Sequence, residues 1–96
     1  MMLKVISIDH IQPFEITCSL NDGSKRMIDV KPLLEKHHHF AGISDLLRKE
    51  RFMEVEIGQM GEICWRKVIH FAGNEELWDY DISPEFIFYE GKKIQN

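Results

Sequence analysis

The chain has 96 residues, of which 44% are hydrophobic and 29% are charged, and its formal net charge is −4. This length suits one domain over residues 1–96, and the composition is that of a globular protein, which excludes a disordered or low-complexity chain. The cations are scattered in short groups and do not form the clustered basic face that duplex binding usually needs, so we expect no direct nucleic-acid partner.

The first apolar run, residues 3–9, predicts a β-strand and carries three β-branched residues. The connection that follows reaches Pro13, which lacks the N–H group needed for strand pairing and is expected to end it. Because Lys4 and Asp9 interrupt the run, it is too short for a signal peptide or a membrane span. We therefore expect a cytoplasmic protein with no membrane partner.

A β-hairpin with a defined register is predicted next, because apolar residues alternate with polar ones on both sides of a turn. The apolar residues are Phe14, Ile16, Cys18 and Leu20 before the turn, and Ile28 and Val30 after it. A two-residue loop would place Ile16 opposite Asp29. A three-residue loop at positions 21–23 places Ile16 opposite Ile28 instead, and it needs Gly23 in the left-handed conformation. We therefore predict the three-residue loop.

Two cysteines, Cys18 and Cys64, fall within strand patterns and show no CxxC spacing. This placement is typical of buried, reduced cysteines that pack as small hydrophobes. A disulfide would need their Cα atoms within about 7 Å of each other, and the spacing does not indicate this.

Two short helices are predicted after the hairpin. Pro32 suits the first turn of a helix that continues to Glu35, and residues 37–42 then interrupt the pattern. A second helix is predicted because apolar residues at i, i+3 and i+4 make one stripe on a helical surface. Those residues are Ile43, Leu46 and Leu47.

Residues 52–57 and 62–72 predict two further strands, joined by a turn at 58–61. In the first strand, apolar residues alternate with Glu54 and Glu56, which is typical of a strand with one wet face. In the second strand, alternate residues are expected to share one face. These residues are Ile63, Trp65, Lys67, Ile69 and Phe71.

A type II′ turn at Gly73 and Asn74 is predicted to lead into a last strand. The apolar residues of that strand are Leu77, Trp78 and Tyr80. Together with the preceding strand it forms the last predicted hairpin.

A last helix is predicted over residues 84–90. Ser83 offers an N-cap hydroxyl, and Pro84 suits the first helical position. Gly91 is expected to end the helix. The helix is too apolar to stand free in water, so we expect it to dock on the sheet or on another chain. All these elements predict an α+β fold, in which an antiparallel sheet of about six strands, arranged as hairpins, carries two or three short helices on one face.

The order of these parts resembles a known family. The motifs that carry the resemblance are Asp22-Gly23 and Ile28-Asp29-Val30, Pro32-Leu33-Leu34, Leu46-Leu47, Phe52-Met53-Glu54-Val55, the Trp65 strand, and Asp81-Ile82-Ser83-Pro84-Glu85. Over residues 3–90 the chain resembles the small bacterial family called domain of unknown function 2442. In such proteins the tryptophan strand runs almost at once into the acidic final motif, whereas here residues 66–80 intervene as an apparent added hairpin.

The resemblance implies no established activity and supplies no catalytic residues. Members of that family are often encoded beside another small protein, in pairs that look like toxin and antitoxin. By this resemblance the chain would be the neutralising, antitoxin-like partner.

The three consecutive histidines His37, His38 and His39 are the one cluster that suggests a metal. Consecutive residues on a helix point about 100° apart, so at most two of the three can face one ion, and Glu35 is the one further ligand type close by. We predict a solvated loop without a metal. The alternative is a small metal- or ligand-binding protein that uses this histidine loop.

Carboxylates gather in two places that could suggest acid–base chemistry. They are Glu54 and Glu56 in one strand, and Glu75, Glu76, Asp79 and Asp81 near the last strand. The pattern provides no nucleophile beside a base and no glycine-rich phosphate loop, and alternating acids keep a half-exposed sheet soluble. We therefore predict no enzyme, no catalytic residues and no cofactor.

Several aromatic residues, Trp65, Trp78, Phe86, Phe88 and Tyr89, can belong either to the core or to a binding surface. We predict a non-catalytic protein-interaction module whose partner is a second copy or a small neighbour-encoded protein. The candidate partner-binding residues are Trp78, Tyr80 and Phe88, since interfaces favour aromatic anchors.

Overall fold

The computed structural model describes residues 2–73 and 75–95. Its strands are β1 (Val5–Gln12), β2 (Glu15–Leu20), β3 (Lys25–Asp29), β4 (Glu56–Ile57), β5 (Ile63–His70), β6 (Leu77–Ile82) and β7 (Lys92–Ile94). Its helices are α1 (Lys31–Lys36), the 3₁₀ helix η1 (Ile43–Leu47), α2 (Lys49–Phe52) and α3 (Pro84–Glu90).

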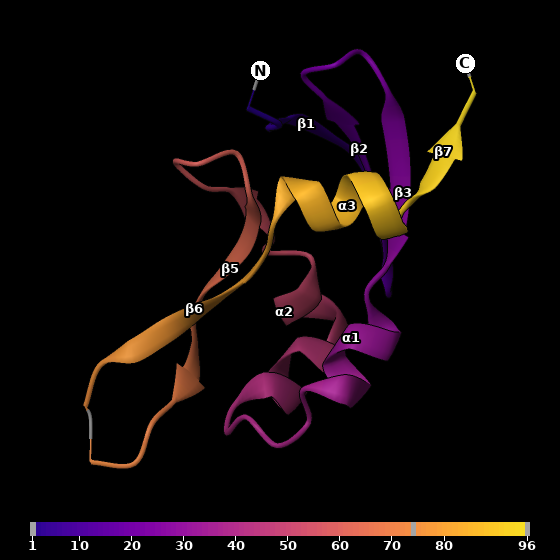
Figure 1. Cartoon of the computed structure of the whole chain (residues 1–96). Helices are drawn as coiled ribbons and strands as arrows, with labels where there is room; N and C mark the ends of the chain where they lie inside the picture. Colours follow the sequence, from indigo (N-terminus) through magenta and orange to yellow (C-terminus); the bar gives the residue numbers. More distant parts are fainter. Residues whose placement is uncertain (1, 74, 96) are drawn as a thin grey trace.

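The predicted α+β class is confirmed, and all strand pairs are antiparallel (Figure 1). In the part of the chain described, the strands divide into two sheets, one in the order β1-β2-β3-β7 and one in the order β4-β5-β6. The two sheets meet where the backbone N–H of Val5 in β1 donates to the carbonyl oxygen of Gly61, at 2.9 Å.

The first strand is longer than predicted. It continues to Gln12, and Ile11 and Gln12 still pair with Ile16 and Glu15 of β2. Pro13 therefore lies in the turn beyond the last pair, where its missing N–H group costs no ladder bond.

The hairpin of β2 and β3 has the predicted three-residue loop. Ile16 lies opposite Ile28, and Gly23 has a φ of 89°. The backbone N–H of Leu20 donates to the carbonyl oxygen of Ser24 at 2.9 Å, which closes the loop. Local turn chemistry and the burial of Ile16 and Ile28 thus agree on one register.

The helical region differs in detail from the prediction. Pro32 lies in the first turn of α1, as expected. The stripe of Ile43, Leu46 and Leu47 belongs to a 3₁₀ helix, however, and only Ile43 and Leu46 are buried. At three residues per turn, positions i and i+3 share a side and position i+4 turns away, so Leu47 faces solvent.

The strand predicted over residues 52–57 is wrong for most of its length, because only Glu56 and Ile57 are extended strand. Phe52 closes helix α2 and is fully buried. Its carbonyl oxygen accepts a hydrogen bond from the indole N–H of Trp65 at 2.8 Å. The burial of Phe52 against Trp65 overrides the local alternation, and Met53 is left exposed.

One core connects the two sheets and the helices. Trp65 and Phe52 are its largest fully buried residues, with ring centroids 5.5 Å apart, and Phe14 packs edge-on against Phe52 at 5.2 Å. The four-stranded sheet contributes residues such as Ile16 and Leu20 to the same cluster.

Helix α3 has the predicted bounds and docks on the four-stranded sheet. Ser83 caps it, since the Ser83 hydroxyl oxygen accepts from the backbone N–H of Phe86 at 3.1 Å. Ile87 is fully buried, and the Arg26 side chain of β3 donates to the carbonyl oxygen of Phe88 at 3.1 Å. Gly91 follows the helix in extended conformation, where a Cβ atom would lie 2.4 Å from the carbonyl oxygen of Ile87.

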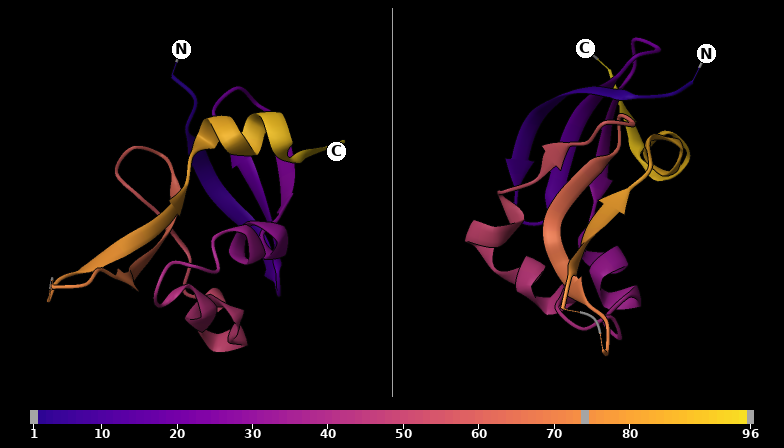
Figure 2. Two further views of the ribbon diagram at one scale, coloured as in Figure 1. Left: turned by 60° about the horizontal axis from the view of Figure 1, so that its bottom comes forward. Right: turned by 90° about the vertical axis from the view of Figure 1, so that its left-hand side faces the viewer.

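The hairpin of β5 and β6 projects away from the other elements (Figure 2). The molecule is accordingly elongated, with principal extents of 45 × 26 × 21 Å. Within the residues described, no helix is long and apolar enough to cross a membrane.

Candidate functional site

The projecting hairpin carries three large apolar side chains in solvent, which we call the hairpin patch. They are Phe71, Leu77 and Trp78, with 43%, 37% and 54% of their surface exposed. The rings of Phe71 and Trp78 meet edge to face, with centroids 5.0 Å apart. Trp78 pairs across the strands with Ile69, which is buried, so the patch borders directly on the core. The predicted Gly73-Asn74 turn involves Asn74, which lies outside the described residues.

The base of this hairpin is irregular. Trp65 pairs with Tyr80 and Ile69 pairs with Trp78, so a four-residue step in β5 faces a two-residue step in β6. Lys67, in the middle of the irregularity, has a φ of 54°. The uninterrupted alternation predicted over residues 62–72 is therefore wrong at this point, because the extra residues of β5 form a bulge in which Lys67 is exposed and Val68 is buried.

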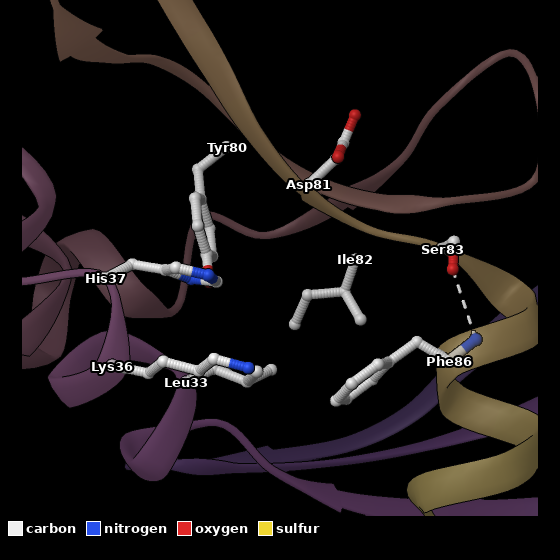
Figure 3. Close-up of a pocket in the computed structure, with 8 residues that line it drawn as sticks. All are labelled: Leu33, Lys36, His37, Tyr80, Asp81, Ile82, Ser83 and Phe86. Carbon is white, nitrogen blue, oxygen red and sulfur yellow. Dashed lines mark hydrogen bonds between the residues drawn. The ribbon is translucent and has the colours of Figure 1, made fainter. Parts of the chain in front are cut away.

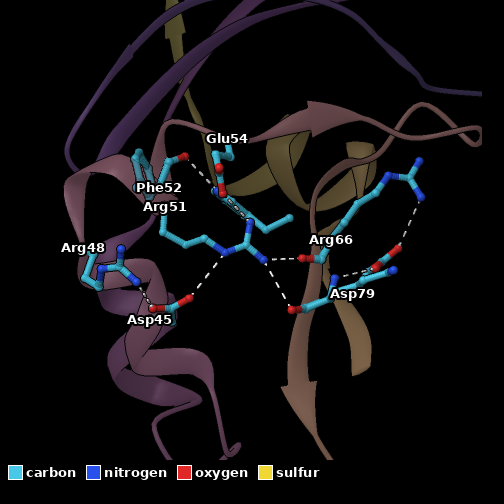
Figure 4. A network of polar contacts seen from close by, with 9 residues as sticks. Asp45, Arg48, Arg51, Phe52, Glu54, Arg66 and Asp79 are labelled. Atoms are coloured by element: carbon cyan, nitrogen blue, oxygen red, sulfur yellow. Dashed lines mark hydrogen bonds and ion pairs between the residues drawn. The ribbon is translucent and has the colours of Figure 1, made fainter. Parts of the chain in front are cut away.

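Arg51 fastens this bulge to the helical layer (Figure 4). Its guanidinium donates to the carbonyl oxygens of Arg66 and Lys67, the two residues at the bulge. The same group pairs with Asp45 of η1 at 3.4 Å and with Glu54 at 2.8 Å. Charge-assisted hydrogen bonds of this kind are stronger than neutral ones, so the hairpin base is held to η1 and α2.

Four carboxylates surround the hairpin patch, and we call them the acidic rim. They are Glu75, Glu76, Asp79 and Asp81, which line the same two surface hollows as Leu77 and Trp78. Asp79 has a structural role as well, since its carboxylate accepts from the backbone N–H of Lys67 at 2.9 Å. Burial, followed by the charges of Glu62 and Asp79, raises the pKa of Asp81. Two cations lie close by, since Lys67 lines one of the same hollows and Arg66 pairs with Asp79 at 3.9 Å, so carboxylates outnumber cations beside the exposed apolar surface.

The three predicted partner-binding residues do not lie together. Trp78 is the most exposed member of the hairpin patch. Tyr80 is only 6% exposed and packs beside Trp65, so it is a core residue and is not accessible to a partner. Phe88 is half-buried on α3, with the Arg26 guanidinium 4.4 Å from the centre of its ring.

The other two members of the patch were missed as site residues. The sequence pattern predicts that Phe71 shares a strand face with Ile69 and that Leu77 lies in the last strand, but it does not mark either residue as part of a binding surface. Pairing the two predicted strands across Gly73 would have placed Phe71 diagonally from Trp78, and that is the signal that could have found the patch.

The prediction of a solvated histidine loop agrees with the exposure of His38 and His39, but it is wrong for His37, which is half-buried. The Nδ1 atom of His37 lies 2.8 Å from the Tyr80 hydroxyl, and its ring stacks on Phe40. Burial, followed by the charges of Lys36 and His39, lowers the pKa of His37.

The other two histidines of the loop, His38 and His39, are exposed. The Nδ1 atom of His38 hydrogen-bonds the carbonyl oxygen of Glu35 at 2.8 Å. Over residues 2–73 and 75–95, no group of three His, Cys, Asp or Glu residues could hold a metal. His37 and His38 thus each have one ring nitrogen engaged within the protein.

Both cysteines are buried and free, as predicted. Burial raises the pKa of Cys18 to about 11 and also raises that of Cys64. Such thiols are poor nucleophiles, so neither is a candidate for covalent chemistry.

Comparison of the chain with protein-family models, curated proteins and solved structures found no match. The resemblance to the domain of unknown function 2442 family therefore stays a prediction based on short motifs. Function has to be inferred from the chain's own residues and geometry.

Proposed function

We propose that the protein is a non-catalytic interaction module that contacts another protein chain through the hairpin patch. The observation that carries this proposal is the exposure of Phe71, Leu77 and Trp78 on a projecting and anchored hairpin. Contiguous exposed apolar side chains rimmed by polar residues are typical of protein–protein contact sites. Tryptophan is also among the residues that contribute most to binding energy in interfaces.

The partner is a basic protein. The acidic rim surrounds the patch, and the whole chain has a formal net charge of −4. Opposite charge at the rim of an interface speeds association and disfavours partners of like charge. A second copy would bring its own acidic rim to the contact, so a different, positively charged chain fits better than self-association.

Backbone pairing offers a further contact. Strand β6 is at the edge of the three-stranded sheet in the described structure, with β5 on its other side. An extended segment of a partner can add to such an edge through main-chain hydrogen bonds. The partner would then meet Trp78 and Asp79 along one strand.

By the resemblance to the domain of unknown function 2442 family, this partner is a small protein encoded by a neighbouring gene. In that case the module is antitoxin-like and acts by covering its partner. The alternative of a metal bound by the histidine loop receives less support, because His37 and His38 use their Nδ1 atoms within the protein.

Co-expression with the neighbouring gene products, followed by size-exclusion chromatography with light scattering, tests the proposal. We expect a stable complex with a basic neighbour, and we expect Trp78→Ser to abolish it. Tyr89→Ser is the matched control, because Tyr89 is an aromatic residue that is 77% exposed on α3. A complex that survives Trp78→Ser, or a strict monomer that no neighbouring product binds, would refute the hairpin patch as the contact surface.

Glu75→Lys tests the charge argument separately. It should slow association with the basic partner and weaken the dependence of the rate on salt. An unchanged association rate would show that the acidic rim does not select the partner.

A further inference from the structure

A second site lies between α1, β6 and α3, apart from the hairpin patch (Figure 3). It is a pocket of about 360 Å³. The residues that line it are Leu33, Lys36, His37, Tyr80, Asp81, Ile82, Ser83 and Phe86. Its volume is at the lower end of the range for pockets that hold small organic molecules.

The floor of the pocket is apolar. Ile82 is buried, and Leu33 and Phe86 are partly buried against the core. Figure 3 shows these three side chains converging from β6, α1 and α3. Residues on three elements therefore provide a surface that suits the hydrocarbon part of a small ligand.

One cation stands beside this floor. The Lys36 side chain runs next to Leu33, with its ammonium group directed toward Phe86 (Figure 3). Lys36 forms no ion pair with the other residues that the structure describes. The carboxylate of Asp81 points away from Leu33 and Phe86 in the same view, so it does not neutralise this charge.

The hydrogen-bonding groups nearby are fixed in place. The Tyr80 hydroxyl oxygen and the Nδ1 atom of His37 are hydrogen-bonded at 2.8 Å, and the two side chains form one wall of the pocket. The Ser83 hydroxyl oxygen already accepts from the N–H of Phe86 at 3.1 Å, so its own hydrogen remains available to donate. The pocket thus combines an apolar floor, one unpaired cation and a hydroxyl donor.

We propose that this pocket binds a small monocarboxylate with an apolar body. The carboxylate pairs with the Lys36 ammonium, and the hydrocarbon part covers Leu33, Ile82 and Phe86. Charge complementarity favours this class over an amine, because the cation is directed into the pocket and the one lining carboxylate is directed out of it. The proposal does not depend on the hairpin patch, since Phe71, Leu77 and Trp78 do not line this pocket.

An NMR titration of the ¹⁵N-labelled full chain tests this with benzoate, cyclohexanecarboxylate and hexanoate as probes. We expect at least one of them to give saturable shifts of the amides of Leu33, Ile82 and Phe86 at millimolar concentration. Benzylamine, which has a ring but the opposite charge, should give no saturable shift at these amides.

Two lysine variants on the same helix make the test specific. Lys36→Met retains the aliphatic stem and should weaken carboxylate binding about two- to fivefold, the contribution of an exposed ion pair. Lys31→Met removes an exposed charge outside the pocket and should bind as the unmodified protein does. Trp78→Ser should also leave carboxylate binding unchanged, which separates this site from the hairpin patch.

Three results would overturn the proposal. They are the absence of saturable shifts with all three carboxylates, benzylamine binding as tight as that of the best carboxylate, and unchanged affinity in Lys36→Met. Since Lys36 is exposed and its variant keeps the stem, loss of folding does not confuse the last result.

Discussion

The close approach of Gly42 to strand β5 predicts a large loss of stability for Gly42→Ala. Gly42 has a φ of 99°, and a Cβ atom there would lie 2.0 Å from the carbonyl oxygen of Val68. Gly23 has a similar φ of 89°, but nothing lies within 4 Å of its Cβ position. Gly23→Ala therefore reports backbone strain alone, whereas Gly42→Ala reports the strain together with the displacement of β5.

The two substitutions should differ severalfold in magnitude. Placing a non-glycine residue in the left-handed region costs about 1 kcal/mol, which is the expected effect of Gly23→Ala. In Gly42→Ala the Val68 carbonyl must also move, and the adjoining hydrogen bond from the His70 N–H to the Ala41 oxygen, 2.9 Å long, is lost with it. That bond contributes about 1 kcal/mol, and with the disturbed packing the total is at least about 3 kcal/mol.

Thermal and urea unfolding followed by circular dichroism measure the difference. In a domain of this size, 1 kcal/mol lowers the melting temperature by roughly 4–8 °C, so we expect a drop of roughly 12 °C or more for Gly42→Ala. Gly73→Ala is a second control, since Gly73 has a φ of 79° and an open Cβ position. If Gly42→Ala melts within a few degrees of Gly23→Ala, the reasoning from the Val68 contact is wrong.

Three further predictions concern side chains. Neither Cys18 nor Cys64 should react with iodoacetamide in the folded protein at mildly alkaline pH, because burial raises the pKa of both thiols; labelling before unfolding by urea would contradict this. Arg51→Met should lower the free energy of unfolding by about 2 kcal/mol through lost charged hydrogen bonds, whereas the exposed Arg48→Met should not move the urea midpoint; equal midpoints would contradict it. Burial lowers the pKa of His37 from its ordinary value of 6.5, so the folded state favours the neutral ring, and the free energy of unfolding should fall as the pH drops below that value. Between about pH 7 and 5, the free energy of unfolding of His37→Gln should therefore fall less than that of the unmodified protein, and an equal fall in both would contradict this.

Local chemistry made parts of the fold predictable. The three-residue loop with Gly23 in left-handed conformation, and the N-cap of α3 at Ser83, each depend on residues next to one another in sequence. Such signals need no tertiary information. The bounds of α3 and the register of Ile16 against Ile28 followed from them directly.

Elements whose conformation depends on distant contacts were not predictable in this way. Residues 52–57 alternate as a strand does, yet Phe52 lies in a helix because it packs against Trp65, thirteen positions further along the chain. Trp78 and Tyr80 share one face of β6 by alternation, but alternation does not reveal that His37 and Trp65 cover only the part of that face around Tyr80. The contact with Tyr80 also leaves His37 half-buried.

The construction of the hairpin is itself an argument for a partner. The base of the hairpin of β5 and β6 is held by buried residues such as Trp65 and Tyr80, and also by Arg51 on its bulge and by Asp79 across the strands. Those polar contacts stabilise a segment that still leaves Trp78 more than half exposed. A chain that fixes such apolar side chains in solvent retains surface that gains free energy only when another molecule covers it.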